Sequence, residues 1–159
     1  REGAREGMSM DLDSLAPQFK GMFESANLIP LYDEIGEILL SSIARNFRTG
    51  GRFGEKDAKG EWQGGSSKWL PSRRAQEQSG RTLQDRNILA RSFSYRSDST
   101  GVTVGSNLVY AAIHQYGGEA GKNRSVTLPP RPIVVVQPED LDEITAAVED
   151  YFARLLVRS

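Results

Sequence analysis

The chain has 159 residues, of which 38% are apolar and 26% charged, and its formal net charge is −1. This length and composition fit one soluble domain with a core of ordinary size. The sequence has no cysteine and one histidine, which excludes disulfides, a cysteine nucleophile and a multi-histidine zinc site within one chain. No apolar run approaches the length that crosses a bilayer, so we expect no membrane segment.

The charge is unevenly distributed. Residues 45–96 hold twelve basic and five acidic side chains. Residues 1–44 hold three basic and eight acidic ones, and residues 97–159 hold five and eight. A basic middle between acidic flanks is compatible with nucleic-acid contact, with head-to-tail pairing of subunits, or with an exposed, solvated loop.

The N-terminal region predicts a flexible start followed by two helices. Residues 1–10 have no apolar signal-peptide core, and we interpret them as a tag or flexible tail ahead of a single domain at 11–159. Apolar residues at helical spacing predict a helix from Leu12 to Phe23. A stronger pattern predicts a helix from Leu31 to Phe47, ended by Gly50 and Gly51.

A Gly-rich stretch at about 49–82 is predicted to be a long, irregular arm. Structureless loops beyond roughly 15 residues are usually functional or disordered, so we expect this arm to become ordered mainly against a partner. Trp69, with Leu70 and Pro71, should pack back on the body, and Arg73 to Gln78 is a candidate short helix.

The second half of the chain predicts an α+β fold in which helices pack on a small antiparallel sheet. A short helical segment at 83–90 leads into a hairpin, in which RSFSYRS pairs with GVTVGS. Ser106 and Asn107 are expected to cap a helix that ends at Gly117 and Gly118. The prolines of 127–136 predict an extended or edge segment that finishes as a strand at 133–136.

The last helix begins at Pro138, with acidic residues in its first turn. Its predicted buried stripe consists of Leu141, Ile144, Val148, Tyr151, Phe152, Leu155 and Leu156.

His114 is the one candidate for histidine chemistry. A catalytic triad would need a serine and a carboxylate close to it in space, which sequence cannot show. Val109, Ile113 and Tyr116 are spaced as the buried side of a short helix, and His114 lies beside that side near the helix C-terminus, where the dipole favours a partly protonated ring. We therefore interpret His114 as a packing residue.

Other candidate sites have simpler explanations. The acidic clusters lie at predicted helix starts, where negative charge is stabilising. The glycine pairs lack the spacing of a phosphate-binding loop. We assign no catalytic, cofactor-binding or metal-ligating residue. The basic stretch interleaved with tryptophan is a candidate protein interface, whose members are Trp62, Trp69, Arg73, Arg74 and Arg81.

Several motifs together resemble a known family. They are RNFRTGGRFG, SSKWLPS, SGRTLQDRNILARSF, VTVGSNLVYAAIHQYGG and TLPPRPIVVVQPEDLDEI. Their order resembles the phage virion morphogenesis family, which includes the G-like protein of Mu-type phages and the tail completion protein of P2-type phages. The resemblance extends from about Ile35 to the last helix. Its signature residues are Gly105, Asn107, Tyr110, His114, Gln115, Gly117, Gly118, Pro130, Arg131 and Pro132.

The resemblance implies a structural protein rather than an enzyme. Such a protein would complete the tail and join it to the head, as a homo-oligomer that forms a ring and contacts tail and neck proteins. It would be found in the virion, and in the bacterial host cytoplasm during assembly. The alternatives are a DNA-binding module at the phage neck, with non-specific DNA contact, and a hydrolase that uses His114. The run at 133–136 replaces the Phe-Leu-Gly type of sequence expected after Arg-Pro, and the loop around 55–65 is longer than expected.

Overall fold

A computed structural model describes residues 21, 24–51, 54–56, 62–64 and 69–158. The elements in chain order are α2 (Ile29–Thr49), β1 (Gly54–Lys56), β2 (Trp62–Gly64), α3 (Arg73–Glu77), β3 (Phe93–Asp98), β4 (Gly101–Ser106), α4 (Ala111–Tyr116), β5 (Gly118–Ala120), the 3-10 turn η1 (Lys122–Arg124), β6 (Val126–Leu128) and α5 (Pro138–Arg158). This arrangement confirms the predicted α+β class. The strands form three separate antiparallel pairs, β1–β2, β3–β4 and β5–β6. Apart from Gly21, the helix predicted from Leu12 to Phe23 lies outside the described residues.

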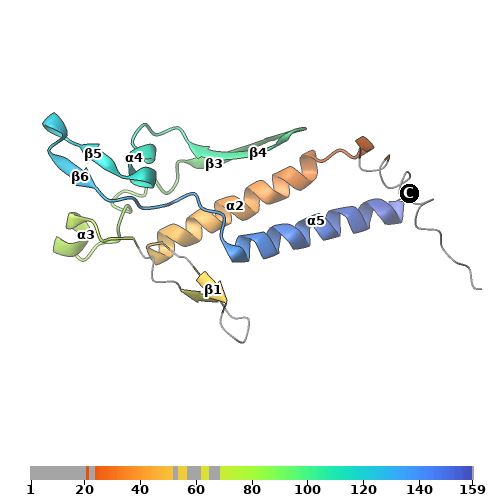
Figure 1. Ribbon diagram of the computed structural model, residues 1–159, viewed down its shortest axis with the longest axis horizontal. Coiled ribbons are helices and arrows are strands. Elements are labelled where there is room, and N and C mark those ends of the chain that lie inside the picture. The colour runs from red at the N-terminus through yellow and green to blue at the C-terminus, as the bar shows by residue number, and fades with distance from the viewer. Residues whose placement is uncertain (1–20, 22–23, 52–53, 57–61, 65–68, 159) are drawn as a thin grey trace, which may run out of the picture.

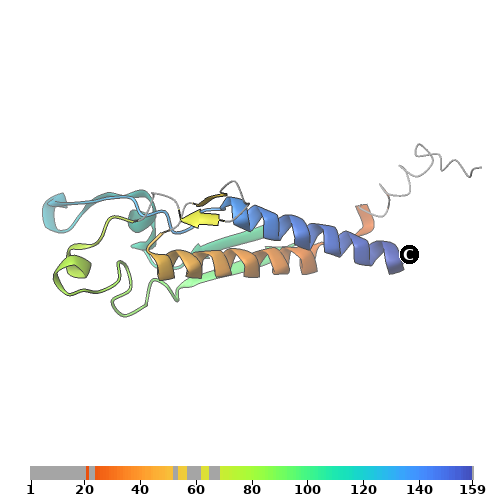
Figure 2. The ribbon, with the colours of Figure 1, turned by 90° about the horizontal axis from the view of Figure 1, so that it is seen from below.

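The molecule is elongated, and its two ends differ (Figures 1 and 2). The antiparallel helices α2 and α5 lie side by side along the long axis, and the β3–β4 hairpin packs against α2. The short elements α3, α4, β5 and β6 gather at one end (Figure 1). We call residues 69–91 and 107–137 the loop end, and residues 24–41 and 141–158 the helix end.

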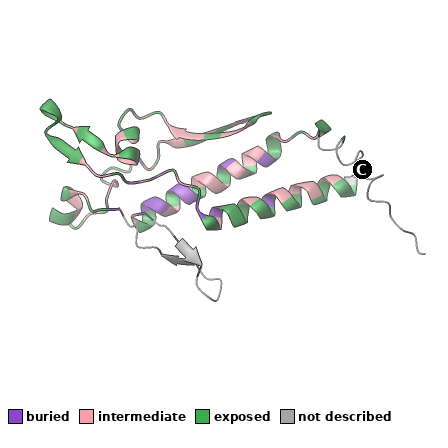
Figure 3. Cartoon of the chain, viewed as in Figure 1, coloured by how far each residue is buried: buried purple, intermediate pink, exposed green. Residues whose placement is uncertain are grey.

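Helix α2 begins two residues earlier and ends two residues later than predicted. Pro30 lies in its first turn, where a missing N–H costs little. Gly50 ends the helix in the left-handed conformation, with φ of 73°. The α2 residues Leu31, Ser42, Ile43, Asn46 and Phe47 are buried, and Figure 3 shows buried positions along this helix and at the start of α5.

The hairpin matches its prediction. Strand β3 pairs with β4 in a register that places Phe93 opposite Ser106 and Asp98 opposite Gly101. Alternate residues of β3 face α2, and Tyr95 lies directly over Gly36. A Cβ at Gly36 would come within 2.4 Å of the Tyr95 ring, so this close packing of strand on helix requires glycine.

The core lies where α2, the loop end and the hairpin meet. Its buried residues are Ile43, Phe47, Trp69, Leu89 and Ile133. Phe47 meets Trp69 edge to face, with ring centroids 5.4 Å apart. Such a pair adds to the stabilisation from burial. Because these residues lie far apart in sequence, the core depends on long-range contacts.

Helix α5 confirms the last predicted helix, but its buried stripe is narrower than expected. Ala147 is buried, whereas Leu141 is 54% and Leu156 49% exposed. The prediction was wrong for these two leucines because α5 packs mainly against α2, which covers only one narrow side. The remaining members of the stripe are half-buried.

Two other predictions were wrong. The arm at 49–82 is not wholly irregular, because it contains β1, β2 and α3. The segment 83–90 forms turns instead of a helix, because Leu83 and Asn87 adopt left-handed φ angles of 61° and 55° that break a helix. The short helix predicted at Arg73 to Gln78 is confirmed as α3.

Candidate interface at the loop end

An extended segment, residues 129–137, joins β6 to α5, and we call it the strap. The predicted strand at Ile133 to Val136 does not form there. The Gln115 side chain occupies the hydrogen-bonding positions that a neighbouring strand would fill. Its Oε1 accepts from the N–H groups of Ile133 (2.7 Å) and Val134 (3.0 Å), and its Nε2 donates to the Val134 carbonyl (3.1 Å).

The middle of the strap is bound to α4 on one side and to the arm on the other. The Arg131 N–H donates to the His114 carbonyl at 2.8 Å. Arg131 Nε donates to the Leu70 carbonyl at 2.9 Å, and Trp69 Nε1 donates to the Pro132 carbonyl at 3.0 Å. The signature residues His114, Gln115, Arg131 and Pro132 therefore meet in one set of hydrogen bonds that fixes the strap.

The strap ends in a buried polar cluster at the start of α5. Asn46 Nδ2 donates to the Ile133 carbonyl (2.9 Å), and Gln137 Nε2 donates to Asn46 Oδ1 (3.1 Å). Asp140, which is fully buried, accepts from the Gln137 N–H (2.9 Å), from Ser42 Oγ (2.6 Å) and from Arg45 (3.0 Å). The Asp140 bond to Gln137 is one half of a capping box. This cluster ties the strap and both long helices together.

The three signature glycines have different environments. Gly117 has φ of 73°, and a Cβ there would lie 2.8 Å from the Pro130 nitrogen. It is therefore required by both backbone conformation and close approach to the strap. Gly118 also has a positive φ, 141°, but a Cβ there would meet only ordinary contacts. At Gly105 a Cβ would meet no atom within 4 Å, so the structure gives no steric reason for glycine there.

Helix α4 is shorter than predicted, and the side of it that was expected to be buried is largely exposed. It begins at Ala111, so Ser106 does not cap it, and Ser106 Oγ instead accepts from the Leu108 N–H at 3.1 Å. Val109 is 97% and Tyr116 78% exposed, which contradicts the predicted buried side. Packing of Ala111 on the core and the bonds from Gln115 to the strap set the rotation of α4 instead. Asn107 is exposed.

His114 is half-buried and its ring meets Tyr110 edge to face, with centroids 6.1 Å apart. Its Nδ1 is buried and has no hydrogen-bond partner among the described residues. Burial lowers the pKa of His114, and the nearby positive charge of Arg131 lowers it further. Burial and the charge of Arg131 thus oppose the partly protonated ring that was expected near the helix C-terminus.

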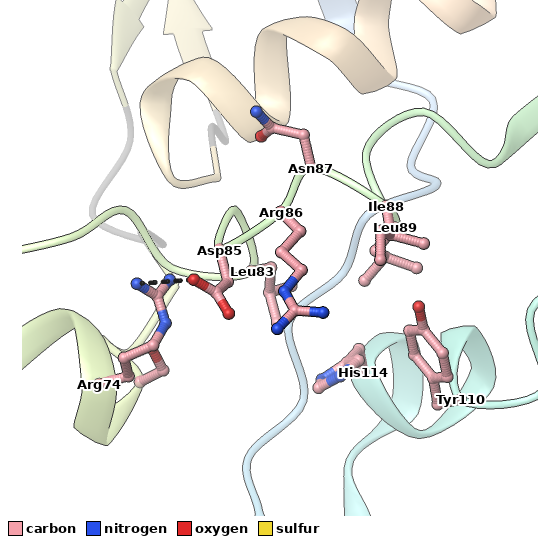
Figure 4. Close-up of a pocket in the computed structure, with 10 residues that line it drawn as sticks. Arg74, Leu83, Asp85, Arg86, Asn87, Ile88, Leu89, Tyr110 and His114 are labelled. Carbon is pink, nitrogen blue, oxygen red and sulfur yellow. Dashed lines mark ion pairs between the residues drawn. The ribbon is translucent and has the colours of Figure 1, made fainter.

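A pocket of about 340 Å³ opens beside His114 (Figure 4). Its lining residues are Ser72, Arg74, Leu83, Asp85, Arg86, Asn87, Ile88, Leu89, Tyr110 and His114. Ser72 Oγ caps α3 by accepting from the Ala75 N–H, and Asp85 lies 3.6 Å from Arg74. No hydrogen bond joins His114 to either group within the described structure, so this is not a triad geometry.

The predicted interface residues occupy different positions. Trp69 lies in the core at 5% exposure, so it cannot serve as a surface anchor in this conformation. Arg73 is exposed and pairs with Glu77 at 2.7 Å. Arg74 donates to the Arg81 carbonyl at 3.0 Å and so closes the loop after α3. The side chain of Trp62 is outside the described residues. An interface role for these arginines stays a prediction.

The charge of Arg131 is unusual. This side chain is 4% exposed, and burial lowers its pKa. No ion pair links it to any acidic residue in the described ranges, although buried charges are ordinarily paired. Its charge acts on His114, which lines the pocket together with Arg74, Arg86 and Asp85.

Several of these residues were not identified in the sequence analysis. Ser42 and Asn46 interrupt the apolar face of α2 at helical spacing, and polar residues at such positions signal a buried network. Ile88, which is 53% exposed, could not be recognised as a pocket residue, because the segment 83–90 was expected to form a helix.

Across the ranges that the structure describes, no three histidine or acidic side chains gather as metal ligands. Within the same ranges, no helix is both long and apolar enough to span a bilayer.

Comparisons with known proteins agree on one family. The model of the phage virion morphogenesis family matches residues 11–153. The chain is 33% identical over 132 residues to the Mu-like prophage FluMu G protein 2 of Haemophilus influenzae, which covers 83% of each protein. No solved structure matches the chain. The chain belongs to the phage virion morphogenesis family, a structural family whose members contact other virion proteins.

Proposed function

We propose that this protein completes the phage tail and joins it to the head, through self-assembly and contact with neighbouring tail and neck proteins. It acts in the virion after assembly in the bacterial host cytoplasm, and it catalyses no reaction. The single observation that carries this proposal is the match of nearly the whole chain to a family of virion assembly proteins.

The loop end supports a contact role. Its buried polar groups hold the strap and α4 in place, and this leaves apolar side chains exposed around them. These are Val109, Tyr116, Val134 and Val136, with exposures from 37% to 97%. Tyr116 and Val134 line one shared hollow, and exposed apolar side chains that lie together usually mark protein contacts. A rigid support beneath an exposed surface suits a protein that docks onto others.

The direct test is deletion of the gene from its phage, followed by electron microscopy of the lysate. We expect separate heads and tails, and restoration of joined particles when the intact gene is supplied. Val109→Asp with Tyr116→Asp should fail to restore joining, whereas Val126→Asp, at an exposed valine on β6, should restore it. Normal joined particles from the deletion would contradict the proposal.

A second candidate function, DNA contact at the neck, is favoured by the charge of the loop end. Residues 69–91 and 107–137 hold eight basic and three acidic side chains. If the protein contacts DNA, its affinity for duplex DNA should fall steeply with salt concentration. An affinity that is negligible at low salt would remove this candidate.

A further inference from the structure

The two ends of the molecule carry opposite charge. The loop end has eight basic and three acidic residues, whereas the helix end has eight acidic and two basic residues. The two regions meet at the start of α5, but the C-terminal half of α5 lies at the opposite end of the long axis from α3 and α4 (Figure 1), so one molecule cannot bring these parts together. Two copies placed head to tail would do so, and opposite potentials both attract and orient such partners.

The pocket beside His114 is lined by apolar and basic side chains and by one carboxylate, Asp85, which Arg74 contacts. Leu83, Ile88 and Leu89 supply the apolar surface, and Arg74 and Arg86 supply the charge (Figure 4). Arg74 already contacts Asp85, whereas Arg86 is exposed and has no ion pair within the described structure. The buried Arg131, which also lacks an acidic partner there, adds positive charge behind His114. The pocket is therefore suited to a surface that carries both a carboxylate and small apolar groups.

The outer face of α5 is such a surface. Ala146, Glu149, Ala153 and Leu156 recur at helical spacing, and all four are exposed. Glu149 forms no ion pair with the residues described, unlike Asp150, which lies 2.5 Å from Arg154. A carboxylate between small side chains can approach a pocket closely without steric conflict.

We propose that the pocket at the loop end receives the outer face of α5 from a second copy of this chain, with Glu149 against Arg86. This inference rests on the proposed function and deepens it by naming the two surfaces through which copies assemble. The contact joins two different surfaces, so each copy keeps one pocket and one α5 face available. Successive copies then close into a ring or extend into a filament.

Charge reversal tests the contact in solution. Mass measured by sedimentation at low salt should exceed that of one chain for the unaltered protein. Arg86→Glu should weaken association at least about tenfold, as expected for a rim charge facing its counterpart. Glu149→Arg should weaken it similarly, and the double variant should restore it. Lys122→Glu makes the same charge change at the loop end outside the pocket, and should alter association less than about threefold.

The possible outcomes distinguish loss of the contact from misfolding and from DNA binding. Neither Arg86 nor Glu149 forms an ion pair in the described structure, so melting temperatures should stay unchanged and exclude misfolding as the cause. A single-chain mass for the unaltered protein, an unchanged mass for Arg86→Glu, or no restoration in the double variant would overturn the inference. Loss of duplex DNA binding in Arg86→Glu with no change in mass would overturn it in favour of DNA. Head–tail joining is scored separately in phage. Intact joining by a variant that does not associate in solution would therefore contradict this inference but leave the proposed function in place.

Discussion

The helix end and the loop end are built in different ways. At the helix end, two long helices whose apolar residues recur at helical spacing pack on each other. Exposed ion pairs such as Arg154 with Glu34 link the two helices. At the loop end, short elements are held by bonds between side chains and distant backbone groups, as between Gln115 and the strap. The helix end therefore follows from local sequence pattern, whereas the loop end depends on particular polar residues.

The largest effect should come from Asp140, at the junction of the two regions. Asp140→Ala leaves Ser42 and the Gln137 N–H without their buried acceptor and removes one partner of Arg45. We expect a loss of about 3 kcal/mol in the free energy of unfolding, measured by urea denaturation.

Glu143→Ala is the matched control, because Glu143 binds the same Arg45 but is 42% exposed. It should cost less than about 1 kcal/mol. Equal losses for the two variants would show that burial of the Asp140 cluster does not strengthen the junction.

The next effect concerns the loop end alone. Gln115→Leu removes three hydrogen bonds to the strap and leaves the Ile133 N–H without its acceptor. We expect a loss of about 2 kcal/mol in the free energy of unfolding. Gln115→Glu keeps the accepting oxygen and should cost less. A smaller loss for leucine than for glutamate would contradict the hydrogen-bonded strap.

At the helix end, Gly36→Ala should show that close packing matters more than helix propensity. Alanine in an exposed helix position gains up to about 1 kcal/mol over glycine. Here the new Cβ would press on the Tyr95 ring, and overpacking typically costs about 1–3 kcal/mol. Thermal unfolding should show a net loss, and truncation of the ring in Gly36→Ala with Tyr95→Ala should make the alanine favourable. A gain from Gly36→Ala alone would refute the tight packing of the hairpin on α2.

The smallest effect is the pH dependence from His114. Its pKa in the folded protein lies below the ordinary value of 6.5, so the unfolded chain binds more protons near that pH. This contribution to stability is fully present above pH 6.5 and is lost as the pH falls through 6.5 towards the folded pKa. His114→Gln should show a weaker decline in the free energy of unfolding between about pH 7.5 and 5.5. An identical decline would mean that His114 is as well solvated as in the unfolded chain.

The same contrast explains what the sequence could predict. Helices α2 and α5 and the β3–β4 hairpin follow from periodicity and turn residues that act locally. The rotation of α4 could not be predicted, because Gln115 sets it through bonds to residues 18 and 19 positions away. The turns at 83–90 escaped prediction because Leu83 adopts a left-handed conformation that its residue type disfavours.

The candidate site was predicted in part. The motif residues His114, Gln115, Arg131 and Pro132 were identified by resemblance, and the structure supplies their physical link. The pocket was not predicted, because its lining joins three separate segments of chain that only the fold brings together.

The central claim is that copies of this protein assemble through the loop end and the outer face of α5. Hydrogen exchange of the backbone amides, compared between the free chain and purified joined particles, tests it most directly. We expect new protection at residues 83–89 and 109–116 and on the exposed face of α5, with little change along the β3–β4 hairpin. Protection confined to the hairpin, with the loop end exchanging as fast as in the free protein, would contradict the account.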